Sequence, residues 1–199
     1  MKTLRAPKSW LLSCLYLFIA SGPLLTANAS YDVFMYATDS TTVIGETLDQ
    51  EAQRLGAFEV LSFKIGAENT VNIGSISGGG GAGRATFKAM TLTKKVDTAS
   101  TGFFTHLTNG QHLDEMIIYM RQSGSPSGDT FLRYTLKFVM VQDISWSGSD
   151  GDDIVEETIV IQYGAMQIDY YKQKLDGSFE PAKTAQWSQV LNEASLEIN

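Results

Sequence analysis

The chain has 199 residues, with 15 basic and 22 acidic side chains and a single cysteine, Cys14. This length is enough for one domain with a sizeable core. The acidic balance argues against nucleic acid as a partner, because phosphate binding needs a basic surface. No internal disulfide is possible, so the core alone must hold the fold.

The first 29 residues have the pattern of a secretory signal peptide. Cations occur within residues 1–8, the apolar run WLLSCLYLFIA follows, and Ala27 and Ala29 form an A-x-A cleavage site. We expect cleavage before Ser30, which divides the chain into a signal peptide at 1–29 and a mature domain at 30–199. The alternative is a misassigned start codon upstream of a chain that begins near Tyr31.

Cleavage would change the composition of the product as well as its length. It removes three cations and no acid, which shifts the net charge from −7 to about −10, and it also removes Cys14. The apolar run is too short for a comfortable membrane span. We therefore expect a bacterial protein that is secreted or periplasmic, without stable membrane insertion of the mature chain.

Most of the mature chain has the alternating pattern that is typical of strands. In the segment at 84–94, residues alternate between two faces, and Met90, Leu92 and Lys94 share one of them. Gly164 is a candidate bulge position within a long strand. The predicted strands lie at 31–37, 57–65, 84–94, 113–121, 131–142 and 157–174, and a final segment runs through Trp187.

One short helix interrupts the strands. Ser100 is a candidate N-cap, Phe103 and Leu107 recur at helical spacing, and Asn109-Gly110 supplies a left-handed stop. Many strands and one short helix predict a mainly β fold, either a barrel or a sandwich, with the helix laid against it.

The stretch SGGGGAGRA at 77–85 resembles two nucleotide-binding motifs but satisfies neither. A P-loop needs Lys where Arg84 stands and Ser or Thr where Ala85 stands. Both motifs also need a helix next, whose N-terminal amides hold the phosphate, whereas a period-two pattern follows here. We interpret the glycines as a structural loop that a partner surface orders, and we predict no cofactor.

The other candidate sites are weaker still. The sequences GSISG and GSPSG lack a central serine, so neither is a nucleophile elbow. His106 and His112 belong to no metal motif. We therefore predict no catalytic, cofactor-binding or metal-ligating residues.

Two further groups of residues admit two interpretations. Asp150, Asp152 and Asp153 lack the spacing of a calcium loop, so a solvated hairpin tip is the favoured interpretation. Trp146 and Trp187 are compatible with a sugar-binding face, but in a strand-rich chain such residues more often lie in a core or an interface.

Several segments, in order, resemble the haemolysin-coregulated protein (Hcp) family, which forms the tube of type VI secretion systems. The resemblance runs from YDVFMYA at Tyr31 to about Asn192, almost the whole mature chain. Its most specific element is SGGGGAGRATF. LTKKVDTAS, YMRQSG, FLRYTLKFVMV, IDYYKQKLDGS and Trp187 follow in the family's order and spacing.

The resemblance implies a small closed β-barrel with one flanking short α-helix and no catalysis. It also implies hexameric rings that stack head-to-tail into a hollow tube, which carries effector proteins in its lumen, meets other secretion components and is itself exported. The glycine loop then becomes the connection to neighbouring subunits, with the contact residues Gly78, Gly79, Gly80, Gly81 and Gly83.

One departure keeps a second function open. Proteins of this family assemble in the cytoplasm and lack a signal peptide, whereas a chain with a working signal would enter the periplasm unassembled. The alternative is a secreted or periplasmic binding module for a protein or a glycan, and a third possibility, a hydrolase, has no motif behind it. Ring formation by the purified mature domain distinguishes the first two.

The cleavage site generates a direct prediction. The exported protein should begin at Ser30, because Ala27 and Ala29 supply the small residues that the cleavage site requires. N-terminal sequencing of the exported protein tests this, and retention of Met1 would contradict it.

Overall fold

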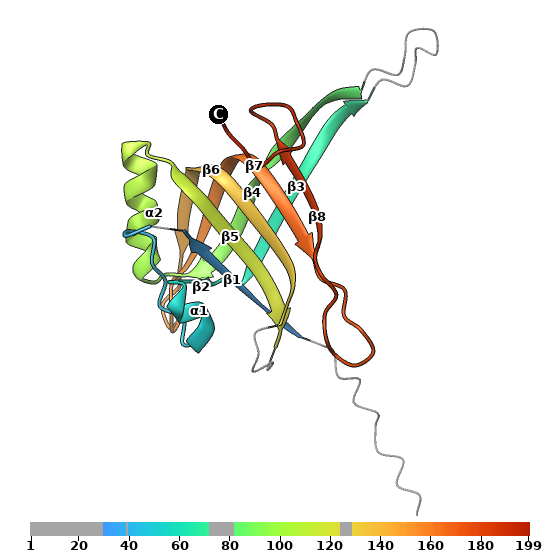
Figure 1. Cartoon of the computed structure of the whole chain (residues 1–199). Helices are drawn as coiled ribbons and strands as arrows, with labels where there is room; N and C mark the ends of the chain where they lie inside the picture. Colours follow the sequence, from blue (N-terminus) through green and yellow to red (C-terminus); the bar gives the residue numbers. More distant parts are fainter. Residues whose placement is uncertain (1–29, 39, 72–81, 124–128) are drawn as a thin grey trace, which may run out of the picture.

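The computed structural model describes residues 30–38, 40–71, 82–123 and 129–199 (Figure 1). The elements are, in chain order, β1 (Tyr31–Ala37), α1 (Gln50–Arg54), β2 (Phe58–Glu59), β3 (Ser62–Val71), β4 (Ala82–Lys95), α2 (Thr98–Asn109), β5 (Leu113–Gln122), β6 (Thr130–Ser147), β7 (Glu156–Tyr170) and β8 (Lys183–Ser188).

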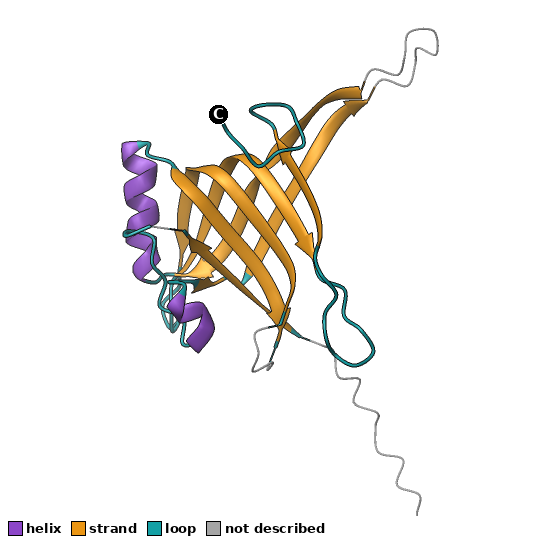
Figure 2. Cartoon of the chain, in the orientation of Figure 1, coloured by secondary structure: helices purple, strands orange, loops and turns teal. Residues whose placement is uncertain are grey.

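The strands form one antiparallel sheet in the order β2-β1-β5-β6-β7-β4-β3, with β8 added beside β7. Figure 2 shows this curved sheet with the two helices gathered at one side. The mainly β class is therefore confirmed. A second helix, α1, was not predicted from the sequence.

The chain passes directly from β2 to β3, which stand at opposite ends of the strand order. The N–H of Val60 donates to the carbonyl of Val33 in β1 at 2.9 Å, and the N–H of Leu61 donates to the carbonyl of Thr93 in β4 at 2.8 Å. Within two residues the chain thus changes its partner from β1 to β4. This change divides the strand predicted at 57–65 into β2 and β3.

The main core is shared by the strands of the sheet and extends to α2. Phe103 of α2 is fully buried and packs edge-to-face on Phe58, with ring centroids 5.5 Å apart. At Gly102 a Cβ atom would lie 2.1 Å from the carbonyl oxygen of Thr42, so only glycine permits this close approach. The largest fully buried side chains of the strands include Met35, Met90, Leu92, Met116, Ile118, Met120, Leu136, Ile159 and Ile161.

A smaller apolar cluster lies on the opposite face of β1 and β5, beneath α1. It contains Phe34, Ala52, Ala57, Ile117 and Tyr119. The two faces of these strands are therefore both covered in this region.

Two sequence-based expectations need correction. The N-cap of α2 is Asp97, and Ser100 is the third helical residue, whose hydroxyl completes a capping box. At Gly164 the ladder between β6 and β7 stays in register, and the irregularity lies between Val141 and Asp143 instead. A side chain at position 164 would crowd Val190 and Ile198, so the small residue Gly164 fits there. The predicted stop of α2 is confirmed, since Gly110 has a φ of +70°.

The hairpin of β3 and β4 projects beyond the rest of the sheet (Figure 1). β4 pairs with β3 from Ala82 onward, but its ladder with β7 begins only at Met90. Where β4 and β7 separate, the side chain of Gln189 bridges them: its Oε1 accepts from the N–H of Phe87, and its Nε2 donates to the carbonyl of Tyr163. Neither helix of the described residues is long and apolar enough to cross a membrane.

Candidate functional site

The glycine loop lies mostly outside the described residues, since Gly78, Gly79, Gly80 and Gly81 precede β4 and only Gly83 belongs to it. The loop is followed by a strand, as predicted, and not by the helix that both nucleotide motifs require. The predicted cleavage-site residues Ala27 and Ala29 also lie outside the described part, and Ser30 directly precedes β1.

The two histidines have local partners. His106 contacts the hydroxyl of Thr42 at 3.1 Å and the carbonyl of Gln111 at 3.0 Å, and His112 lies 3.2 Å from a carboxylate oxygen of Asp114. Among the described residues, no group of three or more His, Cys, Asp or Glu side chains is placed to hold a metal ion.

The two tryptophans do not share a face that one sugar could cover. Trp146 lies opposite Glu157 of β7, and Trp187 lies opposite Met166 of the same strand. These positions are nine residues apart, which corresponds to roughly 30 Å along a strand. Trp146 instead packs on Phe104 of α2, with ring centroids 6.0 Å apart.

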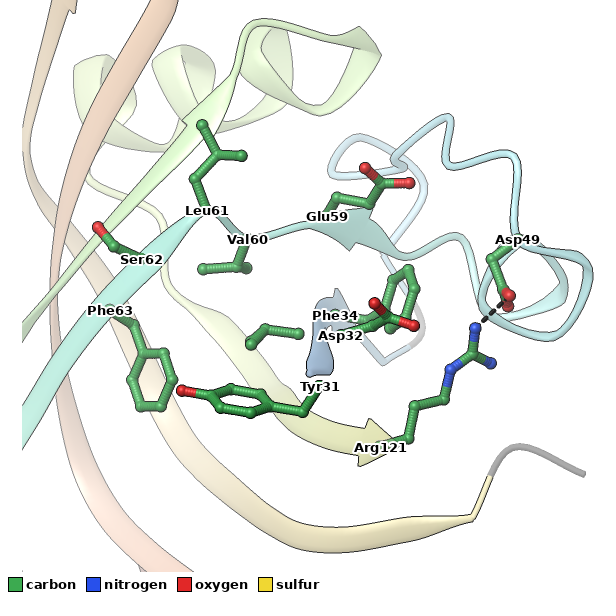
Figure 3. A pocket seen from close by; sticks show the side chains of 11 residues that line it. Tyr31, Asp32, Phe34, Asp49, Glu59, Val60, Leu61, Ser62, Phe63 and Arg121 are labelled. Atoms are coloured by element: carbon green, nitrogen blue, oxygen red, sulfur yellow. Dashed lines mark hydrogen bonds and ion pairs between the residues drawn. The ribbon is translucent and has the colours of Figure 1, made fainter. Parts of the chain in front are cut away.

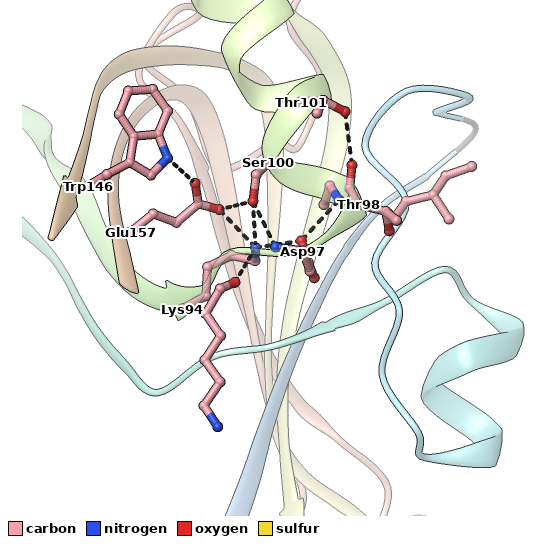
Figure 4. A network of polar contacts seen from close by, with 10 residues as sticks. Lys94, Asp97, Thr98, Ser100, Thr101, Trp146 and Glu157 are labelled. Carbon is pink, nitrogen blue, oxygen red and sulfur yellow. Dashed lines mark hydrogen bonds and ion pairs between the residues drawn. The ribbon is translucent and has the colours of Figure 1, made fainter. Parts of the chain in front are cut away.

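A buried polar network joins α2 to the sheet (Figure 4). Lys94 and Glu157 are fully buried, and the ammonium of Lys94 lies 2.8 Å from the Glu157 carboxylate. The same ammonium donates to Asp97 at 2.6 Å and to the carbonyl of Lys95 at 2.7 Å. Ser100 donates to Glu157 at 2.5 Å.

The second carboxylate oxygen of Glu157 accepts from the indole of Trp146 at 3.0 Å, so one acid connects β6, β4 and α2. Alternation along the sequence placed Lys94 on the same face as Met90 and Leu92, which is the buried face. Its acid partner lies 63 residues away, and no local pattern identifies it. The charged groups of this network, Lys94, Asp97 and Glu157, all have hydrogen-bonding partners, and the network attaches α2 to the sheet.

A hollow of about 730 Å³ opens where β1 and β3 diverge, and we call it the seam notch (Figure 3). Its walls are the start of β1 at Tyr31–Phe34 and the chain at Glu59–Phe63. In Figure 3 the side chains of Tyr31 and Phe63 point toward one another across it. Asp49 and Arg121 complete its rim.

The rim of the notch contains an ion pair between Arg121 and Asp49, the N-cap of α1. The guanidinium of Arg121 also lies over the ring of Phe34, 4.7 Å from its centroid. The hydrogen bond from Arg121, followed by the amides of Glu51 and Ala52, holds the pKa of Asp49 below its usual value despite partial burial. A carboxyl whose pKa is lower in the folded chain than in the unfolded chain stabilises the fold at pH values above its unfolded-state pKa. This contribution is lost as the pH falls through its folded-state pKa.

A second buried acid anchors β8. Burial alone would raise the pKa of Asp169, but hydrogen bonds from Thr184, Gln167 and Arg133 lower it overall. Thr184 belongs to β8 and donates at 2.6 Å, and Arg133 belongs to β6 and donates at 2.9 Å. Asp169 therefore ties the last strand to the two before it.

Comparison with known sequences points to one family. A model of the family described as "Type VI secretion system effector, Hcp" matches residues 34–170. The curated protein hcp1 of Pseudomonas aeruginosa is 29% identical over 89 residues, which cover 45% of this chain. The aligned stretch spans 55% of the length of that relative.

Solved structures share the fold over a larger part of the chain. A type six secretion system protein superimposes with a TM-score of 0.73 and 25% identity, covering 82% of this chain and 99% of its own. Hcp1 from Salmonella typhimurium gives a TM-score of 0.64 at 23% identity, with 82% and 98% coverage. A type VI secretion system effector from Yersinia pestis gives 0.60 at 17% identity, with 79% and 99% coverage.

The buried network predicts strong coupling between its two ions. Replacing Lys94→Met should destabilise the protein by about 3–5 kcal/mol, because it leaves the Glu157 carboxylate buried without a counter-charge. The double variant Lys94→Met with Glu157→Leu should lose much less than the sum of the two single variants. Urea unfolding followed by circular dichroism measures each free energy.

The control is Lys88→Met, since Lys88 lies on the same strand as Lys94 and forms an exposed pair with Glu68 of β3. We expect a change within about 0.5 kcal/mol for this variant. A Lys94→Met protein as stable as the control would show that the network does not hold α2.

Because the pKa of Asp49 is lowered, replacing it with a neutral residue should lower the free energy of unfolding by an amount that depends on pH. Asn at this position keeps the helix cap but loses the charge that faces Arg121, so Asp49→Asn should cost about 1 kcal/mol near neutral pH. The cost should shrink at a pH low enough to protonate the native carboxyl, which lies below the usual range because its pKa is lowered. Urea unfolding at both pH values is the measurement, and an equal cost at both would exclude the ion pair as its cause.

Proposed function

Because the chain belongs to the Hcp family of type VI secretion proteins, we propose that it is a ring-forming tube subunit of such a system. The family is structural and not enzymatic. The proposal rests on the match between the family model and residues 34–170 of this chain. The proposed ring is a hexamer, and the rings stack into a hollow tube.

The subunit of this ring is proposed to be a closed barrel. The change of partner at Val60 and Leu61 supports closure, because one continuous segment bonds to β1 on one side and to β4 on the other. The seam notch is then the part of the wall where this segment leaves β1.

Two surfaces at opposite ends of β3 and β4 support head-to-tail stacking. Four exposed or partly exposed apolar side chains surround one hollow at the first end: Leu48, Leu61, Val96 and Ile154. The projecting part of the hairpin lies at the other end, and in the sequence the glycine loop connects its two strands. A repeated contact between two different patches is what a heterologous assembly requires.

We further propose that the chain is secreted and that effector proteins travel in the lumen of the tube. The signal peptide at 1–29 is proposed to direct it through the periplasm. The alternative function, a secreted binding module that keeps the same fold for a protein or a glycan, is favoured only by the signal peptide.

Ring formation should depend on salt. Each mature subunit carries a net charge of about −10, so repulsion opposes assembly. Repulsion between exposed charges extends over about 8 Å at physiological salt, and it extends over about 30 Å at 0.01 M. Residues 30–199 should therefore form discrete rings at moderate salt and smaller species as salt is removed. Light scattering after size-exclusion chromatography across a salt series measures both.

The glycine loop supplies a matched variant for the same experiment. Replacing Gly79 and Gly80 with Val should impair assembly, because β-branched residues resist positive φ, while circular dichroism stays native. A protein that remains monomeric at every salt concentration would favour the binding module. Rings that tighten at low salt would overturn the electrostatic argument alone.

A further inference from the structure

Among the described residues, nothing pairs with one edge of the start of β1, and this edge faces the seam notch. The carbonyl of Ser30 accepts from Ser123 on the β5 side, and the carbonyl of Val33 accepts from Val60 on the other side. Because backbone groups alternate along a strand, Tyr31 directs its N–H and C=O to the same side as Val33. In the described part of the chain, the ladder with β2 covers only Phe34 and Met35.

The notch has an apolar inner wall. Val33 and Phe63 pack against the main core, and Tyr31 stacks edge-to-face on Phe131 with ring centroids 5.9 Å apart. A side chain that enters between them would extend the core. The inner wall therefore suits apolar side chains.

The outer rim of the notch is acidic. The residues that line it include the acids Asp32, Asp49 and Glu59 and one cation, Arg121, which is already paired with Asp49. Asp32 accepts from the hydroxyl of Ser123 at 2.7 Å, and Glu59 accepts from that of Thr47 at 2.9 Å. Neither hydroxyl neutralises a carboxylate, so two negative charges remain at the rim.

From this geometry we infer that the seam notch binds an extended segment of a partner protein with alternating apolar and basic side chains. A strand added to the free edge of β1 would place every second side chain on the inner wall and the others at the rim. Lys or Arg at the rim positions would face Asp32 and Glu59. A second copy of this chain fits the rim less well, because its net charge is also negative.

The inference is tested with two short peptides and the full chain. Acetylated VKVKV, labelled with a fluorophore, should bind saturably, and VEVEV should not. Methylating the central backbone nitrogen of VKVKV should abolish binding, because it removes an N–H that strand pairing needs. Fluorescence anisotropy measures each affinity.

The matched variants neutralise two carboxylates inside or outside the notch. Asp32→Asn with Glu59→Gln keeps an acceptor oxygen for Ser123 and Thr47 and should weaken VKVKV binding about tenfold. Glu68→Gln with Asp114→Asn makes the same change of charge at exposed positions outside the notch and should leave binding unchanged.

Three results would overturn the inference. They are equal binding of both peptides, equal affinity in both double variants, or binding that survives backbone methylation. If the chain associates with itself, and only the double variant at Asp32 and Glu59 abolishes this association, then the notch binds a second copy of the chain and not a partner protein. The peptide assay does not require rings, so failure of the proposed tube function leaves its result interpretable.

Discussion

A lysine ammonium without access to water must find its partners inside the protein, and Lys94 finds them on three segments. The carboxylates come from Asp97 at the start of α2 and from Glu157 of β7, and a carbonyl comes from β4 itself. Removing two ions from water is costly, and good geometry with further hydrogen bonds must offset that cost. The network therefore fixes where α2 begins and how it lies on the sheet, since any other placement would leave a buried charge unpaired.

The short elements follow the same rule. A helix of five residues such as α1 is not stable in isolation, and the Asp49 cap with its pairing to Arg121 holds it against β1 and β5. Asp169 does the same for β8 through Thr184. The sheet and its core define the fold, and a few polar contacts between distant residues determine where its smaller parts attach.

Alternation predicted the strands well, since β1 has the predicted bounds and β4, β5 and β7 differ from theirs mainly at the ends. It could not predict the division between β2 and β3, because that depends on which neighbour accepts from Val60 and Leu61. It also missed α1, whose stabilising partner Arg121 is 72 residues from its cap. For the site, the sequence predicted correctly that a strand and not a helix follows the glycine loop. The seam notch arises where two strands diverge, and no local sequence pattern indicates this.

The separation of β4 from β7 determines how the molecule would transmit mechanical force. A pull along the projecting hairpin acts parallel to its strands, so it loads the hydrogen bonds between β4 and β7 in shear, and these bonds resist together and do not open one at a time. The force reaches the rest of the sheet at Met90, where the ladder with β7 begins, and beside it through Gln189. A protein built in this way transfers axial tension from its projecting hairpin into its most extensively paired strands.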